Sequence, residues 1–386
     1  MAHGVVDAAI IGGGIIGASI AERIQCSEPS WRCVIFEAEE APGTGETRWA
    51  TGGVRHQFGT EPNIRLSLIS VPVFENFPDE YGIDPAFRRH GYLFVTADEK
   101  RLALMDRERE LQNSLGVPTQ RLDREQLRKH CPPLFVDDLL GGNFCALDGS
   151  IEPAWVLQGY IDNFRRHGGS LATAAPVVEI EHTGTTWRLT TPRATYDTPI
   201  VVIACGPHTR AVAALAKLDV PVQPYARQVF VAQALPAIPP VIPLTIDIDT
   251  GWYIHAHHAE LLLGGTDKET RPLDGATADV DWTAFETVYH AATHRMPALA
   301  EANILHAYAG ARTLTPDHHP ILGPVETHPG IYLACGLSGH GIMHAPAVGI
   351  LLAEWITEGR PRTWDAAPLT IARFRKPRAL AETAVF

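Results

Sequence analysis

Several features that mark membrane or nucleic-acid-binding proteins are missing from this 386-residue sequence. No stretch approaches the ~18 consecutive apolar residues that a membrane-spanning helix needs, so we expect no transmembrane segment. Lysine and arginine number 32 against 44 aspartates and glutamates, which gives a net charge of −12. Because a nucleic-acid partner requires a basic face, this balance argues against one.

Signals of secretion are missing too. The N-terminus MAHGVVDAAIIGGG has neither a basic segment nor a small-residue cleavage site, so we expect no signal peptide and a cytoplasmic location. The six cysteines include no Cys-x-x-Cys pair, and we expect free thiols in a reducing compartment. They are Cys26, Cys33, Cys131, Cys145, Cys205 and Cys335.

A glycine-rich turn near the N-terminus is the first positive signal. The apolar run Ala8 to Ile11 predicts a strand, and the apolar spacing after the glycines predicts a helix. Such glycines let the backbone approach a pyrophosphate at a helix N-terminus, and an acid that ends the next strand, here CVIFEAE, accepts hydrogen bonds from a ribose. The pattern therefore predicts a dinucleotide site. We assign to it Gly12, Gly14, Ile15, Gly17, Glu37 and Ala38.

The segment after Glu37 indicates which dinucleotide is bound. A nicotinamide-dependent dehydrogenase would continue with alternating strands and helices, whereas this chain continues with the polar loop EAPGTGETRWATGGVRHQFG. Such a loop can wrap the far end of a longer cofactor, which favours FAD over NAD. A later buried strand, TPIVVIACGPHT, strengthens this reading. We assign to the same cofactor Arg48, Thr51, Gly52, Gly53, Val178, Ala204 and Gly206.

Motifs along nearly the whole chain carry a family resemblance. They are GGGIIG with Glu37, TGGVRHQFG, VVIACG, the pair GWYIH and LLLGGTD, and AGARTLTPDHHPILGP with GIYLACGLSGHGIMHAPAVG. Together they resemble the D-amino-acid oxidase and sarcosine oxidase family of FAD-dependent amine oxidoreductases. GGVRHQFGTEPNI and GHGIMHAPAVG are most similar to the β subunits of heteromeric sarcosine oxidases and the flavin subunits of dye-linked proline dehydrogenases.

The resemblance implies a two-domain α/β fold. We expect a Rossmann-like FAD-binding domain of the glutathione-reductase type and a substrate domain with a mixed or antiparallel sheet. The FAD-binding domain must be discontinuous, because its motifs lie far apart in the sequence. We predict residues 1–80, 146–215 and 305–386 in the FAD-binding domain, and 81–145 and 216–304 in the substrate domain. The C-terminal segment KPRALAETAVF is expected to be a loose tail.

The resemblance also explains the dense glycines of GLSGHGIMHAP. In the family this turn packs under the isoalloxazine ring, and its amides point at the N1–C2=O edge, where the start of a helix stabilises negative charge. The resemblance therefore assigns Gly310, Arg312, Gly339, His340, Gly341, Ile342 and Met343 to the cofactor.

Substrate binding is expected to depend on arginine, whose guanidinium pairs with a carboxylate through two hydrogen bonds. Arg55 and Arg312 resemble the family's carboxylate-binding arginines, and His340 its flavin-side histidine. Tyr253 and His255 alternate on a predicted strand and so share one face. Asp317, His318 and His319 are adjacent on a turn and are not expected to converge on a metal, so no metal site is predicted. The catalytic candidates are Arg55, His56, Tyr253, His255, Arg312 and His340.

The chain departs from the monomeric sarcosine oxidases at three positions. Gly310 and Ala311 stand where those enzymes carry the cysteine that links FAD, so we expect noncovalent FAD. Met343 and Leu262 stand where they carry lysines, the second of which activates oxygen. The electron acceptor is therefore left open between oxygen and another compound.

The expected activity is oxidation of a C–N bond in an amino acid or secondary amine, such as sarcosine, proline or another N-alkyl amino acid. A hydride passes to flavin N5 and an imine results. Oxidation of a 2-hydroxy acid or of a specialised pathway intermediate is one alternative. A flavin subunit that needs a partner for activity is another, and a homo-oligomer also stays open.

Overall fold

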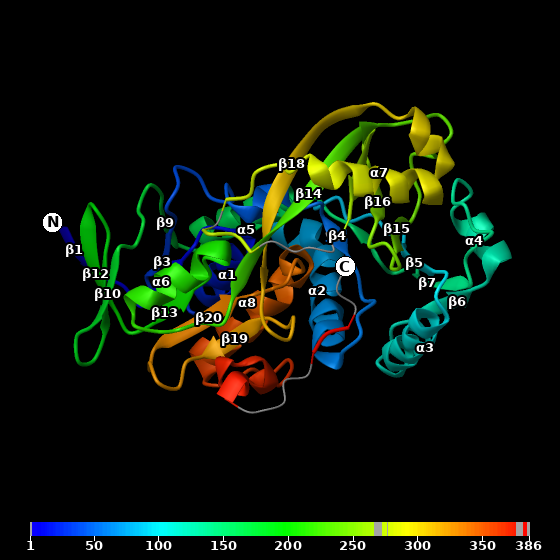
Figure 1. Cartoon of the computed structure of the whole chain (residues 1–386). Helices are drawn as coiled ribbons and strands as arrows, with labels where there is room; N and C mark the ends of the chain where they lie inside the picture. Colours follow the sequence, from blue (N-terminus) through cyan, green and yellow to red (C-terminus); the bar gives the residue numbers. More distant parts are fainter. Residues whose placement is uncertain (1, 266–271, 276, 376–380, 384–386) are drawn as a thin grey trace.

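A computed structural model describes residues 2–265, 272–275, 277–375 and 381–383 of the protein (Figure 1). The glycine motif lies at the centre of a six-stranded sheet. Five of its strands are parallel, and β19 joins one edge as an antiparallel strand. In spatial order the strands are β19 (Ile321–Pro324), β20 (Ile331–Cys335), β13 (Val201–Ile203), β2 (Ala8–Ile11), β3 (Cys33–Phe36) and β9 (Ser170–Ala172).

Helices α1 and α8 form the tightest helix pair beside this sheet. Gly349 on α8 meets Ser19 on α1, and a Cβ added to Gly349 would lie 2.1 Å from the Ser19 Oγ. Ser19 also donates a hydrogen bond of 2.8 Å to the carbonyl of Ala345. The small residues thus let the two backbones approach closely. The helices of this core cluster are α1 (Ile15–Ser27), α2 (Glu61–Tyr81), α5 (Pro153–Arg166) and α8 (Gly341–Glu358).

A second, eight-stranded sheet is mixed. Only β15 and β5 pair in parallel, and the other neighbours are antiparallel. Its order is β18 (Ile304–Leu314), β14 (Gln223–Gln233), β17 (Glu260–Gly264), β16 (Tyr253–His257), β15 (Leu244–Asp247), β5 (Tyr92–Thr96), β7 (Gly141–Cys145) and β6 (Gln120–Leu122). The helices of this part are α3 (Glu99–Ser114), α4 (Arg124–His130) and α7 (Thr283–Arg295).

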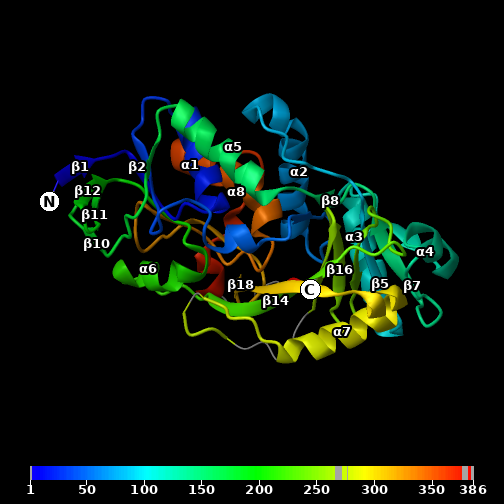
Figure 2. The same ribbon diagram turned by 90° about the horizontal axis from the view of Figure 1, so that it is seen from above.

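The long strands β14 and β18 connect the two parts of the molecule. In Figures 1 and 2 they run from the region of the six-stranded sheet to the region that contains α3, α4 and α7. Their register pairs Tyr225 with Arg312 and Arg227 with Gly310. The C-terminal end of β18 therefore brings the AGART segment beside the region of the glycine motif.

Smaller elements complete the fold. A four-stranded sheet has the order β1 (Ala2–Val5), β12 (Ala194–Thr198), β11 (Trp187–Thr190) and β10 (Glu179–His182), and β4 (Gly53–Val54) pairs with β8 (Gly149–Ser150). The short helices are η1 (Glu46–Trp49), η2 (Gly206–His208), α6 (Thr209–Leu215), η3 (Pro297–Glu301), η4 (Ala367–Leu369) and η5 (Ile371–Arg375).

The predicted fold class is confirmed, since a Rossmann-like sheet is joined to a mixed sheet. The exact domain boundaries stay a prediction. Residues 81–145, which we assign to the substrate domain, contain α3 and α4 and supply β5, β6 and β7 to the eight-stranded sheet. Among the described residues, none of the helices is both apolar enough and long enough to span a bilayer.

The expectation of a loose C-terminal tail is wrong for the part that the structure describes. Glu382 is buried and accepts hydrogen bonds from the Gly59 amide at 2.6 Å, the Thr60 hydroxyl at 2.6 Å and the Asn63 amide group at 2.8 Å. A carboxylate with three donors is anchored despite its terminal position. Residues 376–380 and 384–386 lie outside the described residues.

Candidate active site

Two glycines at the turn between β2 and α1, Gly12 and Gly17, have no room for a side chain. Gly12 has a φ of +111°, and a Cβ there would lie 2.4 Å from the carbonyl oxygen of Ala204. A Cβ on Gly17 would lie 1.9 Å from the carbonyl oxygen of Gly12. Helix α1 begins at Ile15, with Gly14 as its N-cap residue. The start of the helix presents backbone amides, which suits a pyrophosphate, and the amide of Ile15 donates a 3.1 Å hydrogen bond to Oγ1 of Thr47.

Glu37 is held against this turn at the end of β3. Its two carboxylate oxygens accept hydrogen bonds from the amides of Gly13 at 2.8 Å and Glu39 at 2.9 Å. On the other side, the buried Ala204 directly follows β13, and a Cβ on Gly206 would meet open space. Ala38 directly follows Glu37. These features fit the adenosine end of a dinucleotide.

The polar loop after Glu37 folds back over β18. Glu46 on η1 accepts a 2.6 Å hydrogen bond from the amide of Ala311, and burial raises the pKa of Glu46 to about 7. Trp49 stacks on Tyr308 with ring centroids 5.4 Å apart, and the Arg48 guanidinium lies 4.0 Å from the centre of the Trp49 ring. The loop therefore reaches the AGART segment, as a cofactor-wrapping loop must.

The next two glycines of the loop, Gly52 and Gly53, also have no room for a side chain. A Cβ on Gly52 would lie 2.1 Å from the carbonyl oxygen of Ile151, and one on Gly53 would lie 1.9 Å from the Tyr92 hydroxyl. Thr51 precedes them and is half-buried. Gly310 likewise has no room for a side chain, since its Cβ would be 2.9 Å from the Glu46 carboxylate.

Arg55, Arg312 and His340 meet at the centre of the molecule. Nη2 of Arg55 lies 3.3 Å from Nε2 of His340. The Arg55 guanidinium stacks over Phe58 at 4.3 Å from the ring centre. Arg312 donates a 2.7 Å hydrogen bond from Nε to the carbonyl of Ser338, in the same glycine turn as His340. Two residues predicted to bind a carboxylate and the predicted flavin-side histidine are thus brought together.

The electrostatics of this cluster follow from burial and like charge. Burial lowers the pKa of Arg55. Burial, with the positive charges of Arg227 and Arg55, lowers the pKa of Arg312 to about 9. Burial first, and then the charges of Arg55 and Arg312, hold the pKa of His340 well below its usual value. His340 is therefore neutral at pH 7, and an anion placed between the guanidiniums would relieve their repulsion.

The turn that carries His340 explains the glycines of GLSGHGIMHAP. Gly339 has a φ of +86°, and a Cβ there would lie 2.5 Å from Nε of Arg312. Helix α8 starts at Gly341, and no described side chain caps it. The first amides of a helix have no acceptor within the helix. The amides of Gly341, Ile342 and Met343 are thus placed to stabilise negative charge.

Tyr253 and His255 lie on β16, on one face as predicted. Tyr253 is half-buried, its ring packs against Gly264, and burial raises the pKa of its hydroxyl. The positive charge of Arg312 acts on this hydroxyl in the opposite direction and lowers its pKa. His255 is buried, and burial lowers its pKa to about 3. Tyr253 is therefore nearer to the arginine cluster, whereas His255 lies beside His90 and His257.

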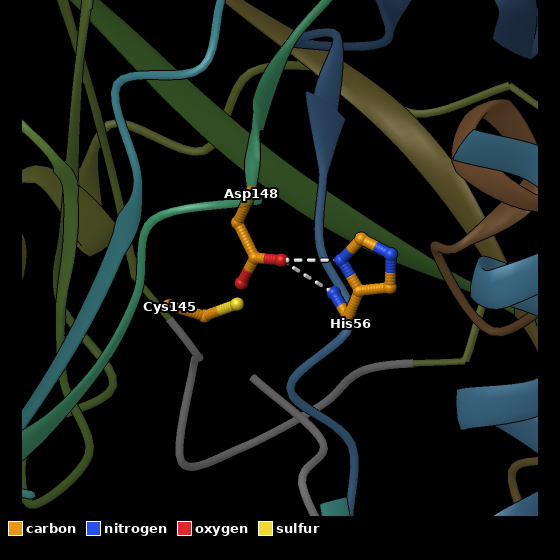
Figure 3. Close-up of side chains that lie close together, drawn as sticks. All are labelled: His56, Cys145 and Asp148. Atoms are coloured by element: carbon orange, nitrogen blue, oxygen red, sulfur yellow. Dashed lines mark hydrogen bonds and ion pairs between the residues drawn. The ribbon is translucent and has the colours of Figure 1, made fainter. Parts of the chain in front are cut away.

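His56 is bound to a carboxylate that sequence reasoning missed (Figure 3). Oδ1 of Asp148 lies 2.8 Å from both the backbone nitrogen and Nδ1 of His56, and Oδ2 accepts a 3.1 Å hydrogen bond from Gln57. The thiol of Cys145 lies beside this pair. The side chains of His56, Gln57, Cys145 and Asp148 are all buried. Asp148 therefore fixes the orientation of His56, while no local sequence signal distinguishes it from other aspartates.

Two further segments that the sequence singled out make contacts of their own. Val178 is 52% exposed, and its amide donates a hydrogen bond to Thr190 in the four-stranded sheet. Asp317 pairs with Arg373 at 2.7 Å, and His319 lies 2.8 Å from the Thr60 hydroxyl. Asp317 and His319 therefore each have a polar partner in the fold. All six cysteines are free.

The fold and the site together define an oxidoreductase with a long dinucleotide cofactor, because the motif, the wrapping loop and the α8 turn converge on one place. The chain belongs to the DAO family of FAD-dependent oxidoreductases, whose family model matches residues 7–355. The cofactor is therefore FAD, and the glycine cradle, Glu37 and the bare N-terminus of α8 fit it.

Known relatives cover most of this chain. FAD-dependent oxidoreductase domain-containing protein 1 of Bos taurus is 26% identical over 411 residues, 95% of this chain and 84% of the relative. Mitochondrial dimethylglycine dehydrogenase of Rattus norvegicus is 26% identical over 392 residues, and the match spans 95% of this chain but only 44% of that relative. The crystal structure of L-proline dehydrogenase from P.horikoshii has a TM-score of 0.89 and 27% identity, with 97% of this chain and 99% of that chain covered.

Proposed function

We propose that the protein oxidises the C–N bond of an amino acid or N-alkyl amino acid, with noncovalently bound FAD as cofactor. The observation that carries the proposal is the buried pair of guanidiniums at the turn that carries His340, with Arg55 beside its ring and Arg312 bound to the Ser338 carbonyl. A carboxylate is the small anion that arginine holds with two hydrogen bonds in a fixed orientation. Holding the carboxylate places the neighbouring carbon, which bears the amine, at a constant position.

FAD, when bound, supplies the hydride acceptor. Arg55 and Arg312 bind and orient the carboxylate, and Tyr253 lies on their side of the eight-stranded sheet. His340 is neutral at pH 7, so it serves as a hydrogen-bonding group beside Arg55 rather than as a third cation. The amides that begin α8 stabilise negative charge on the reduced cofactor.

Two relatives support an amino-acid substrate. The rat and P.horikoshii proteins are named for dimethylglycine and L-proline. Both compounds are α-amino carboxylates with a substituted nitrogen. A common core of carboxylate, carbon and substituted amine suits the pair of guanidiniums described above.

The proposal is tested by anaerobic titration of the yellow protein with D-, L- and N-methyl amino acids, cyclic imino acids and 2-hydroxy acids. We expect an amino acid to bleach the visible flavin band. Bleaching by a 2-hydroxy acid alone would replace the amine proposal. Admission of air then distinguishes the acceptor, and the leucines of β17 at Leu262 lead us to expect slow recolouring. Acid precipitation should leave the flavin in the supernatant, as noncovalent binding requires.

A further inference from the structure

A group of metal-type donors lies at the turn between β16 and β17. Glu152, the N-cap residue of α5, faces two histidines at the end of β16. Nε2 of His257 lies 3.4 Å from Oε1 of Glu152, and Nε2 of His258 lies 2.9 Å from the same oxygen. The three donor atoms all lie within 4.8 Å of one another.

These separations match the edges of a metal coordination shell. Zinc binds imidazole nitrogen and carboxylate oxygen at about 2.0–2.2 Å, which places two tetrahedral donors roughly 3.3–3.5 Å apart. The distance from His257 to Glu152 already has this value, and that from His258 is shorter by about half an ångström. Small side-chain rotations would therefore admit an ion.

The backbone at the hairpin turn explains how adjacent histidines converge. Side chains of consecutive strand residues point to opposite faces. His257 pairs with Glu260, so that His258 and Ala259 form a two-residue turn, and His258 has a φ of +53°. A turn residue with positive φ is commonly glycine. Here it is a histidine, and the turn brings its imidazole to the same carboxylate as His257.

Exposure leaves room for a solvent ligand. The His258 side chain is 70% exposed, whereas those of His257 and Glu152 are 26% and 20% exposed. Three protein donors with one side open to water is a common arrangement for zinc. Imidazole also favours zinc, copper or nickel over magnesium or calcium, which prefer oxygen donors alone.

We propose that Glu152, His257 and His258 form a binding site for a divalent transition-metal ion, with Zn²⁺ as the probe. The site joins the β16–β17 hairpin to the start of α5, and Figure 2 shows β16 beside β8, the strand just before Glu152. An ion here would fasten the eight-stranded sheet to the part of the chain that packs on α1. Because His257 shares a strand face with Tyr253 and His255, the ion would also restrain the strand that carries two active-site candidates.

Zinc binding to the FAD-loaded protein, freed of metal with a chelator, tests this proposal. Isothermal titration of wild type should show a saturable site that is absent or weakened in Glu152→Gln and in His258→Ala. The weakening should exceed the roughly 10–100-fold loss that removal of an outer-shell partner costs. Zinc should also raise the Tm of wild type and leave that of both variants unchanged.

A matched control is available on α7, where His290 lies 3.7 Å from Glu286 on the surface. His290→Ala should keep the wild-type zinc affinity and Tm shift. Flavin content and Tm without zinc show whether each variant folds. Equal zinc affinity and Tm shift in wild type, Glu152→Gln and His258→Ala would overturn the proposal, and the cluster would then be a hydrogen-bonded contact only.

Discussion

At the scale of single residues, the centre of this protein is a set of buried cations around a neutral histidine. Arg55 and Arg312 cost free energy to bury, and their mutual repulsion adds to that cost. A protein keeps such an arrangement where an anion is bound. Burial shifts the pKa values of Arg312 and His255, and each shift has a measurable consequence.

Binding of a small carboxylate should weaken as the pH rises through the pKa of Arg312. That pKa is about 9, so the guanidinium loses its charge above this pH, and with it the attraction for the anion. We expect the Kd of a carboxylate without an amine, read from the flavin spectrum, to rise about tenfold per pH unit above about 9. Below about pH 9, Arg312→Lys should bind the carboxylate more weakly than wild type. The control Arg210→Lys, at an exposed arginine, should have the Kd of wild type. Equal Kd values for Arg312→Lys and wild type across the pH range would remove Arg312 from the anion site.

Acid should destabilise the protein in part through His255. Its pKa is about 3 in the folded chain and about 6.5 when exposed, so the folded state binds fewer protons between these values. Stability is therefore retained above about pH 6.5 and falls as the pH drops towards 3, by about 1.4 kcal/mol per pH unit for this group. Urea unfolding across that range should give a shallower slope for His255→Phe. The control His290→Phe replaces an exposed imidazole and should keep the wild-type slope, and an unchanged slope in His255→Phe would contradict the assignment.

At the scale of elements, the strand–turn–helix unit β2–α1 is the part that the sequence predicts best. Gly17 faces the carbonyl of Gly12, five positions away, so the spacing of these two glycines indicates the turn, whereas the contact of Gly12 with Ala204 exists only in the folded chain. The pairing of β18 with η1 is different, because Ala311 and Glu46 are 265 positions apart and meet only in the folded chain. The sequence predicted that both segments belong to the site, but not that Glu46 links them.

Replacement of Gly12 by alanine should abolish FAD loading. The added methyl would lie 2.4 Å from the Ala204 carbonyl, in a backbone conformation that disfavours any side chain. Gly45→Ala is the matched control, since a Cβ there meets no atom within 4 Å. The ratio of flavin to protein after purification measures the outcome. Equal loading of the two variants would show that the turn does not cradle the cofactor.

At the scale of the whole molecule, long-range contacts hold the site in ways that no local pattern predicts. Asp148 orients His56 from 92 positions away, and Glu382 binds Thr60 from 322 positions away. The negative charge of Glu382 also raises the pKa of Arg55 and so favours its charged form. Such contacts depend on the tertiary fold, so the sequence suggested a loose tail where the structure has a buried anchor.

Glu382→Ala should destabilise the whole chain. The substitution removes the carboxylate that accepts hydrogen bonds from Gly59, Thr60 and Asn63. Because these hydrogen bonds are charge-assisted, the free energy of unfolding should fall by roughly 1.5–3 kcal/mol. Denaturant unfolding at pH 7 measures the change. Glu301→Ala, at an exposed glutamate, should stay within about 0.5 kcal/mol of wild type. A Glu382→Ala variant as stable as this control would mean that the tail contact contributes nothing.

The central claim is that a C–N bond is oxidised while a carboxylate lies between Arg55 and Arg312. Its most direct test is anaerobic reduction of the bound flavin by a cyclic amino acid and by the same amine without its carboxylate. The amino acid should bleach the flavin band at far lower concentration than the bare amine. Equal bleaching by the two compounds, or bleaching only by a 2-hydroxy acid, would contradict the claim.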